Sequence, residues 1–141
     1  QQMKHSKYGI VNWFIRLALE GQPLTIFGEG LQKRDYIFVQ DLAEGILNVA
    51  LTPATAGQVY NLGSGVGTPF IDMARLVAQT VPGTEIQHLP WPEDRYFVET
   101  GDFIADIAKL QKDTGWAPRT GLKEGIEATV AFYRAHGKHY W

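Results

Sequence analysis

Cysteine is absent from this chain of 141 residues. Its absence excludes disulfides, a thiolate nucleophile and cysteine-based metal sites, and it is typical of proteins in a reducing compartment. Long apolar runs are missing as well, since none approaches the roughly 20 residues that a membrane-spanning helix needs. We therefore predict a cytoplasmic protein without a membrane partner.

An excess of charge of one sign is also missing. The chain has 13 basic and 15 acidic residues, and its formal net charge is -2. No overall positive field attracts nucleic acid, so nucleic acid is not an expected partner. With 45% hydrophobic and 20% charged residues, the composition is typical of a single globular domain, here residues 1–141. The polar start QQMKHSKYG has no initiating methionine, and we expect a fragment of a longer protein.

Residues 23–41, PLTIFGEGLQKRDYIFVQD, are the most informative stretch. Two runs of β-branched and aromatic residues, at 24–27 and 36–39, predict short strands. Gly28 and Gly30 lie between them and allow the positive φ angles of a tight loop. The pattern predicts a hairpin that leads into a helix capped by Asp41.

Arg34 lies at the start of the second predicted strand, next to Lys33. A guanidinium binds two phosphate oxygens at once and keeps its charge, so a phosphate site is one interpretation. The alternative is a solvated hairpin in which Arg34 pairs with Asp35 or another acid. Charged residues are common beside turns, and composition alone favours this alternative.

Apolar residues at helical spacing alternate with short strand-like runs along the chain, which predicts a small mixed α/β fold. The predicted helices cover residues 10–20, 42–51, 69–80, 107–112 and 122–136, with Asp41, Thr68 and Asp106 as the caps of the second, third and fourth. The predicted strands cover residues 24–27, 36–39, 58–62 and 85–89.

A run of glycines, Gly63-Ser64-Gly65-Val66-Gly67, follows the third predicted strand. A strand, glycines and a helix in this order can place a pyrophosphate at the helix N-terminus. Here the spacing is G-x-G-x-G, and no second βαβ unit with a ribose-binding acid follows. A structural turn that admits close packing is therefore the favoured interpretation.

No catalytic set is evident. The four histidines lie apart or, at His136 and His139, lack a carboxylate at metal-ligand spacing, so a frayed surface terminus is favoured over a metal site. Neither serine lies in a nucleophile motif. The acids around Arg95 (Glu93, Asp94, Glu99 and Asp102) allow either an acid–base pair or a loop ion-pair network.

Three motifs occur in a fixed order: PLTIFGEGLQKRDYIFVQDLAEGI, VYNLGSGVG and FIADIAKLQKDTGWAPRTGLKEGI. Together they resemble the C-terminal part of the extended short-chain dehydrogenase/reductase family, the nucleotide-sugar epimerases and dehydratases that include UDP-glucose 4-epimerase and dTDP-glucose 4,6-dehydratase. The resemblance covers nearly the whole chain. It implies a small mixed α/β substrate-binding lobe of a larger enzyme.

The resemblance also implies roles for particular residues. Arg34 matches the diphosphate-binding arginine of the RDYI motif, and Arg95 matches a second phosphate-contacting arginine. Thr25 and Phe27 match positions whose backbone meets the nucleobase. Three further matches are Ile10 and Val11, at the start of a helix that approaches the phosphates, and Glu99, which faces a ribose hydroxyl. Many members read R-P-G-D where this chain reads DRYFVETGD, so Asp102 competes with Glu99 for that role.

In this family NAD and a Tyr-x-x-x-Lys pair belong to an N-terminal Rossmann domain. No tyrosine here has a lysine four residues later, and no N-terminal glycine fingerprint is present. The resemblance therefore implies an NDP-sugar as ligand, the Rossmann domain as partner, no catalytic residue and no cofactor or metal site in this chain, and no activity of the chain alone. Tyr36 is expected in the core or, alternatively, lining the sugar pocket.

Two other functions remain open from the residues alone. One is a non-catalytic descendant of the family that binds RNA or protein, although the chain has no stripe of alternating basic and aromatic residues. The other is a purely structural module without nucleotide affinity. Whichever holds, apolar surface that normally faces a Rossmann domain predicts that the isolated chain forms homo-oligomers.

Overall fold

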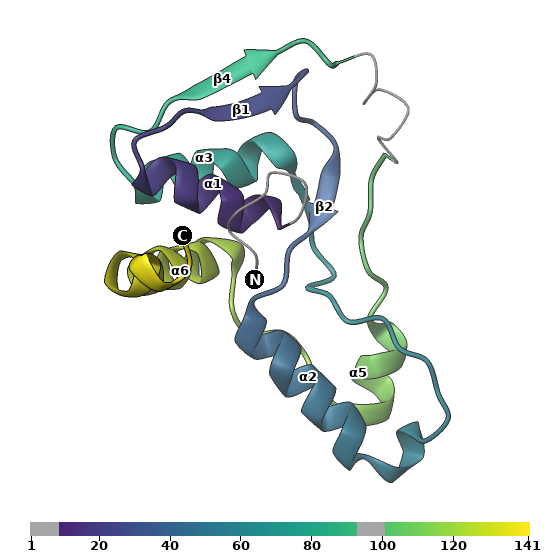
Figure 1. The fold of residues 1–141 in the computed structure, drawn as a ribbon. Coiled ribbons are helices and arrows are strands. Elements are labelled where there is room, and N and C mark those ends of the chain that lie inside the picture. The colour runs from purple at the N-terminus through teal and green to yellow at the C-terminus, as the bar shows by residue number, and fades with distance from the viewer. Residues whose placement is uncertain (1–8, 93–100) are drawn as a thin grey trace. The chain divides into compact units, whose positions relative to one another are not determined.

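The computed structural model describes residues 9–92 and 101–141, and the chain divides into two compact units (Figure 1). The first unit contains Gln1–Leu31, Pro69–Thr100 and Lys123–Trp141. The second contains Gln32–Thr68 and Gly101–Leu122. Both mix helices with short strands, so the predicted small mixed α/β class is confirmed.

The first unit is built around two parallel strands, β1 (Leu24–Phe27) and β4 (Ile86–Leu89). Leu24 is opposite Ile86, and Phe27 is opposite Leu89. Helices α1 (Ile10–Leu19) and α3 (Phe70–Thr80) pack against each other and against these strands, and both lie along one face of the strand pair in Figure 1. Helix α6 (Leu122–His136) and the short turn η2 (Gly137–His139) complete the unit.

The core of the first unit is apolar. Its side chains come from α1, β1, α3 and α6. Its buried side chains include Phe14, Ile15, Leu24, Ile26, Met73, Val77, Ile126 and Val130. In β1 buried and half-buried residues alternate, because successive side chains of a strand point to opposite faces. The predicted helical and strand spacing in this unit is confirmed for α1, β1, β4 and α6.

The second unit pairs two helices and two short strands. Helices α2 (Val39–Leu51) and α5 (Ala108–Thr114) contact each other and the turn η1 (Pro53–Thr55). Strand β2 (Lys33–Asp35) pairs with β3 (Gly67–Pro69), of which Gly67 and Thr68 belong to this unit. Its buried residues include Asp41, Thr55, Ala105, Ile107, Leu110 and Trp116.

The predicted hairpin of residues 24–39 is wrong. Gly28 and Gly30 do adopt positive φ angles of 65° and 69°, but the loop leads away from β1, and the carbonyl oxygen of Gly30 accepts a hydrogen bond from Ile71 N at 2.9 Å. The partner of β1 is β4, which lies far along the chain. Burial of Leu24 and Ile26 under α1 and α3 decides this pairing, and local turn chemistry does not.

The second predicted strand is also displaced. Residues 36–39 were expected to form it, yet β2 ends at Asp35 and α2 begins at Val39. Asp41 is therefore not the helix cap. It lies in the first helical turn, buried, where its Oδ2 accepts a hydrogen bond from Thr120 N at 2.8 Å.

Two other predicted elements differ from the structure. Residues 58–62 form no strand within the described part of the chain, and Val59 is 83% exposed. Thr68 and Pro69 were expected to begin the third helix, but they belong to β3, and α3 begins at Phe70. A strand needs a neighbour for its backbone groups, so apolar sequence alone does not determine where one forms.

The helix ends that depend on local chemistry are closer to prediction. Asp106 Oδ1 accepts a hydrogen bond from Ala108 N at 2.9 Å at the start of α5. This helix ends at Thr114, two residues beyond the predicted end, and is followed by Gly115 with φ 71°. Positive φ is the usual end of a helix with a C-terminal glycine.

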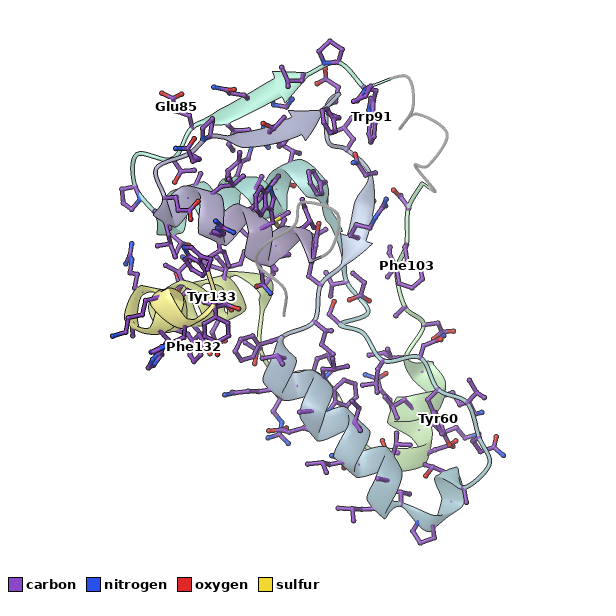
Figure 2. All side chains as sticks on the ribbon, in the orientation of Figure 1. Tyr60, Glu85, Trp91, Phe103, Phe132 and Tyr133 are labelled. Carbon is purple, nitrogen blue, oxygen red and sulfur yellow. The ribbon has the colours of Figure 1, made fainter. Side chains whose placement is uncertain are left out.

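The C-terminal residues pack instead of fraying. The ring of Trp141 lies 5.4 Å from that of Tyr133, and the Arg16 guanidinium lies 5.7 Å from the Trp141 ring. Figure 2 shows Phe132 and Tyr133 together on α6. Of the helices that the structure describes, none has both the length and the apolar character needed to cross a membrane.

Candidate functional site

Arg34 lies in the middle of β2 and is half-buried. Its Nη1 donates hydrogen bonds to two carbonyl oxygens, that of Lys33 at 2.9 Å and that of Gly101. Both acceptors are neutral, and they match the two N–H groups that this nitrogen carries. Main-chain atoms thus hold the guanidinium in one orientation, which is the condition for bidentate recognition of an oxyanion.

The extended segment after residue 100 runs beside β2. Asp102 Oδ1 accepts a hydrogen bond from Lys33 N at 2.7 Å, and Phe103 N donates to the Lys33 carbonyl oxygen at 3.1 Å. Phe103, on this segment in Figure 2, is 62% exposed. Asp102, the alternative ribose-facing acid, therefore has a structural partner in the main chain of β2.

Asp35 points into the glycine run. Its carboxylate accepts hydrogen bonds from Ser64 N at 2.7 Å, Ser64 Oγ at 2.6 Å, Gly65 N at 2.9 Å and Ala105 N at 3.1 Å. A Cβ on Gly63 would lie 2.6 Å from Asp35 Oδ2 and 2.5 Å from the Ala105 Cβ. The glycine run is thus a structural turn built around an internal carboxylate, and it does not fit the pyrophosphate of NAD.

Tyr36 follows Arg34 by two residues in extended backbone, so the two side chains point to the same face. Its ring is half-buried, and its hydroxyl oxygen is buried with no hydrogen-bond partner in the part of the chain that the structure describes. Burial raises the pKa of the Tyr36 hydroxyl to about 12, while the charge of Arg34 acts to lower it. The hydroxyl is therefore protonated at neutral pH and able to donate a hydrogen bond.

Thr25 and Phe27 lie on β1, in the first unit. Leu24 N and Gly28 N donate to the carbonyl oxygens of Glu85 and Leu89, so these alternate residues direct their backbone toward β4. Because N–H and C=O groups alternate along a strand, Thr25 and Phe27 direct theirs to the opposite edge. This is the geometry that backbone contacts to a nucleobase would need.

Trp91 lies next to the end of β1 (Figure 2). Its ring centroid lies 5.7 Å from that of Phe27, and a Cβ on Gly28 would lie 2.6 Å from Trp91 Nε1. His88 Nδ1 lies 2.7 Å from the Gly28 carbonyl oxygen. The loop after β1 is thus fixed by one side chain of β4, His88, and by one that follows this strand, Trp91.

Ile10 and Val11 form the first turn of α1, as predicted, and both are half-buried. Gly9 precedes them with φ 69°. These two residues, like Thr25 and Phe27, belong to the first unit, whereas Arg34 belongs to the second. Arg95 and Glu99 lie in residues 93–100, outside the described residues.

Metal-ligating residues do not gather within residues 9–92 and 101–141, where no group of three or more His, Cys, Asp or Glu side chains is placed to hold an ion. His136 instead lies with its ring 4.8 Å from that of Phe132. The described geometry offers phosphate recognition by Arg34 and backbone recognition by β1.

Comparison with known proteins agrees with the order of the sequence motifs. Residues 1–63, which include β1 and Arg34, match the model of the NAD dependent epimerase/dehydratase family. The chain is 31% identical over 128 residues to dTDP-glucose 4,6-dehydratase of Streptomyces griseus, an alignment that covers 91% of this chain and 38% of that protein. It is also 31% identical over 137 residues to UDP-glucose 4-epimerase of Mycolicibacterium smegmatis, covering 95% of this chain and 42% of that protein.

The chain is similar to members of the NAD-dependent epimerase/dehydratase family.

The fold agrees with that of family members. UDP-glucose 4-epimerase from Thermotoga maritima, solved with UDP-glucose, superposes with a TM-score of 0.80 at 29% identity over 91% of this chain and 40% of that chain. The present chain thus spans about two fifths of the length of the epimerase/dehydratase relatives that it matches. The resemblance stated from the three motifs is confirmed at the level of the family.

The sequence did not indicate the structural roles of three residues near the candidate site. Asp35 and Ser64 join β2 to the glycine run, and Trp91 fixes the end of β1. The run of glycine N–H groups predicts that an acidic group binds it, but nothing in the sequence indicated Asp35, which lies 29 positions from Ser64. No local signal indicated Trp91.

Proposed function

We propose that this chain forms the nucleotide-sugar-binding part of an NAD-dependent epimerase or dehydratase, and that Arg34 binds the diphosphate. The observation that carries the proposal is the fixed guanidinium of Arg34, held through Nη1 by the carbonyl oxygens of Lys33 and Gly101. A pre-oriented arginine loses less rotamer freedom on binding a phosphate. The relatives' substrates support this ligand class: UDP-glucose is present in the Thermotoga maritima epimerase.

Arg34 has a second positive charge next to it, and two carboxylates nearby are held by main-chain N–H groups. Lys33, next to Arg34, is exposed. The nearest acid in the sequence is Asp35, and its carboxylate accepts hydrogen bonds from Ser64, Gly65 and Ala105. Asp102 accepts from the main chain of Lys33. Each of these two carboxylates is thus anchored by hydrogen bonds to the main chain, and Lys33 adds a second positive charge to that of Arg34.

Other parts of the ligand are assigned by the family resemblance. Thr25 and Phe27 contact the nucleobase through the backbone edge that faces away from β4, and Arg95 supplies the second phosphate contact. Glu99 binds a ribose hydroxyl, and the α1 start at Ile10 and Val11 approaches the phosphates. The backbone directions in β1 support the first of these roles.

Hydride and proton transfer are proposed to take place on the part of the enzyme that this chain does not contain. The sequence has no Tyr-x-x-x-Lys pair, and the glycine run binds Asp35 in place of a pyrophosphate. A solved relative, WbmF of Bordetella bronchiseptica, holds NADH. We therefore expect NAD to bind an N-terminal Rossmann domain and the present chain alone to be inactive.

An apolar face on α2 is the proposed contact with that Rossmann domain. Val39, Ile46, Leu47 and Leu51 are 53–80% exposed, and on a helical projection they gather on one side. Residues 58–62, which form no strand within the described residues, belong to the same unit. Apolar side chains exposed to this extent on one helix are typical of a surface that is covered in the complete protein.

Calorimetric titration tests the proposed ligand. The chain is titrated with UDP-, dTDP-, GDP- and CDP-sugars, and compared with Arg34→Ala and with Arg75→Ala as the control. Arg75 is exposed and pairs with Asp72 at 2.9 Å on α3. Loss of a charge-assisted phosphate contact should weaken binding about 10- to 100-fold in Arg34→Ala only.

Two results would contradict the proposal. One is the absence of any nucleotide-dependent heat from a chain that circular dichroism shows to be folded. The other is equal affinity of the wild type and Arg34→Ala. Binding of a single-stranded RNA probe in place of nucleotide sugars would favour the non-catalytic descendant.

A further inference from the structure

The hydroxyl of Tyr36 is a buried polar group whose partner is not found in the described part of the chain. Its oxygen is inaccessible to solvent and has no hydrogen-bond partner among the described residues. Leaving a buried hydroxyl unsatisfied costs about 1–3 kcal/mol. Such groups are rare in native proteins, and each one calls for an explanation, for example a ligand that completes it.

The position of Tyr36 indicates which ligand that is. Asp35 lies between Arg34 and Tyr36 in the sequence, and its side chain points into the glycine run. Alternation along extended backbone therefore places Arg34 and Tyr36 together on the other face. Arg34 is also the charged residue that acts on the pKa of the Tyr36 hydroxyl, which agrees with this proximity.

The chemistry of the pair favours an anionic acceptor. A tyrosine hydroxyl that stays protonated at neutral pH offers one O–H donor, and the guanidinium beside it offers a fixed positive charge. A cation is repelled by Arg34, and a neutral acceptor is attracted to its charge less strongly than an anion is. An oxygen of a phosphate accepts from both at once.

We propose that the Tyr36 hydroxyl donates a hydrogen bond to the same diphosphate that Arg34 binds. The inference rests on the proposed function. It adds Tyr36, which directly follows β2, as a second ligand-binding residue. In the absence of ligand the hydroxyl adds no stabilising hydrogen bond within the described residues. In the complex it contributes to affinity.

The test compares Tyr36→Phe, which keeps the ring and removes only the oxygen, with the wild type and with Tyr60→Phe. Tyr60 is a matched control in the same unit because its hydroxyl already donates to Asp113 Oδ2 at 2.8 Å. Affinity for UDP and for inorganic pyrophosphate is measured by calorimetry, and the Tm of each ligand-free chain is measured by circular dichroism.

Tyr36→Phe should weaken UDP and pyrophosphate by a similar factor, about tenfold. Its ligand-free Tm should equal or exceed that of the wild type, because an unsatisfied buried hydroxyl is removed. Tyr60→Phe should show the opposite pattern, a lower Tm with unchanged affinity.

Three outcomes overturn only the inference about Tyr36. In each of them the wild type still binds and Arg34→Ala does not, so the proposed function holds. The three outcomes are unchanged affinity of Tyr36→Phe, a lowered ligand-free Tm of Tyr36→Phe, and weakened binding of UDP without weakened binding of pyrophosphate. Failure of the folded wild type to bind either probe overturns the proposed function, and the inference with it.

Discussion

The carboxylate of Asp35 accepts hydrogen bonds from both the backbone N–H and the hydroxyl of Ser64, at 2.7 and 2.6 Å. The two residues are 29 positions apart in the sequence, so the contact ties β2 to the glycine run. Gly65 and Ala105 donate to the same carboxylate. Arg34 is covalently next to this anchor, and its position in the structure therefore depends on a residue that does not face the proposed ligand.

Asp35→Asn should destabilise the chain by about 1–3 kcal/mol, because an amide nitrogen then faces N–H donors that have lost a charged acceptor. Urea unfolding measures the loss. Asp72→Asn is the control, since Asp72 is an exposed partner of Arg75 and such pairs contribute about 0–1 kcal/mol. Equal losses in the two variants would show that the Asp35 network has no special role.

Gly28→Ala should cost more than Gly21→Ala. Both glycines have positive φ, 65° and 69°, so each substitution carries the backbone penalty of about 1–2 kcal/mol. Only at Gly28 would the new Cβ collide, at 2.6 Å from Trp91 Nε1, whereas nothing lies within 4 Å of a Cβ on Gly21. Overpacking of this kind adds about 1–3 kcal/mol.

The difference between these two variants isolates the contact with Trp91. Near-ultraviolet circular dichroism should change in Gly28→Ala, because Trp91 must move relative to Phe27. The spectrum of Gly21→Ala should match the wild type. The interpretation fails if the two variants lose the same stability.

Alkaline pH should destabilise the wild type more steeply than Tyr36→Phe. The pKa of Tyr36 rises from 10.0 in the unfolded chain to about 12 in the folded protein, so the folded state binds this proton more tightly. The stability that the proton contributes is complete below pH 10 and is lost as pH rises from about 10 through 12.

The measurement is the free energy of unfolding between pH 9 and about 11.5 for both chains, with ligand absent. Other tyrosines and lysines titrate in the same range, and the comparison with Tyr36→Phe removes their contribution. Parallel pH profiles of the two chains would be inconsistent with a buried, protonated Tyr36.

Leu47→Lys should reduce self-association of the isolated chain. Leu47 is 59% exposed on the apolar face of α2, where a charge opposes contact between apolar surfaces. Asn48→Lys adds the same charge to the polar side of the helix and is the control. Light scattering across a dilution series gives the result; a wild type that is monomeric at every concentration would contradict the prediction.

Much of the secondary structure could be predicted from short-range chemistry. The apolar spacing of residues 10–19 and 122–136, the β-branched run of β1 and the glycines at positions 28, 30 and 115 each act within a few residues. The family, too, is carried by motifs that are local in sequence. Arg34 was selected as a candidate site residue on this basis alone.

The errors concern elements whose position depends on distant partners. The strand expected at residues 36–39 became the approach to α2, and the expected cap Asp41 became an internal acceptor for Thr120. The strand expected at 58–62 has no neighbour within the described part of the chain. In each case the local pattern was compatible with two structures, and the presence or absence of a partner far along the chain decided between them.

The sequence by itself determined the resemblance to the family, the mixed α/β class and the identity of Arg34 as a candidate phosphate ligand, because composition, periodicity and motif order are properties of neighbouring residues. Only the tertiary structure decided that β1 pairs with β4, that Asp35 occupies the glycine run and that the Tyr36 hydroxyl is buried with no partner among the described residues. These features depend on which apolar side chains share a core and on which buried polar groups form hydrogen bonds with each other. The residues that make each contact are far apart in the sequence, so no local pattern determines it.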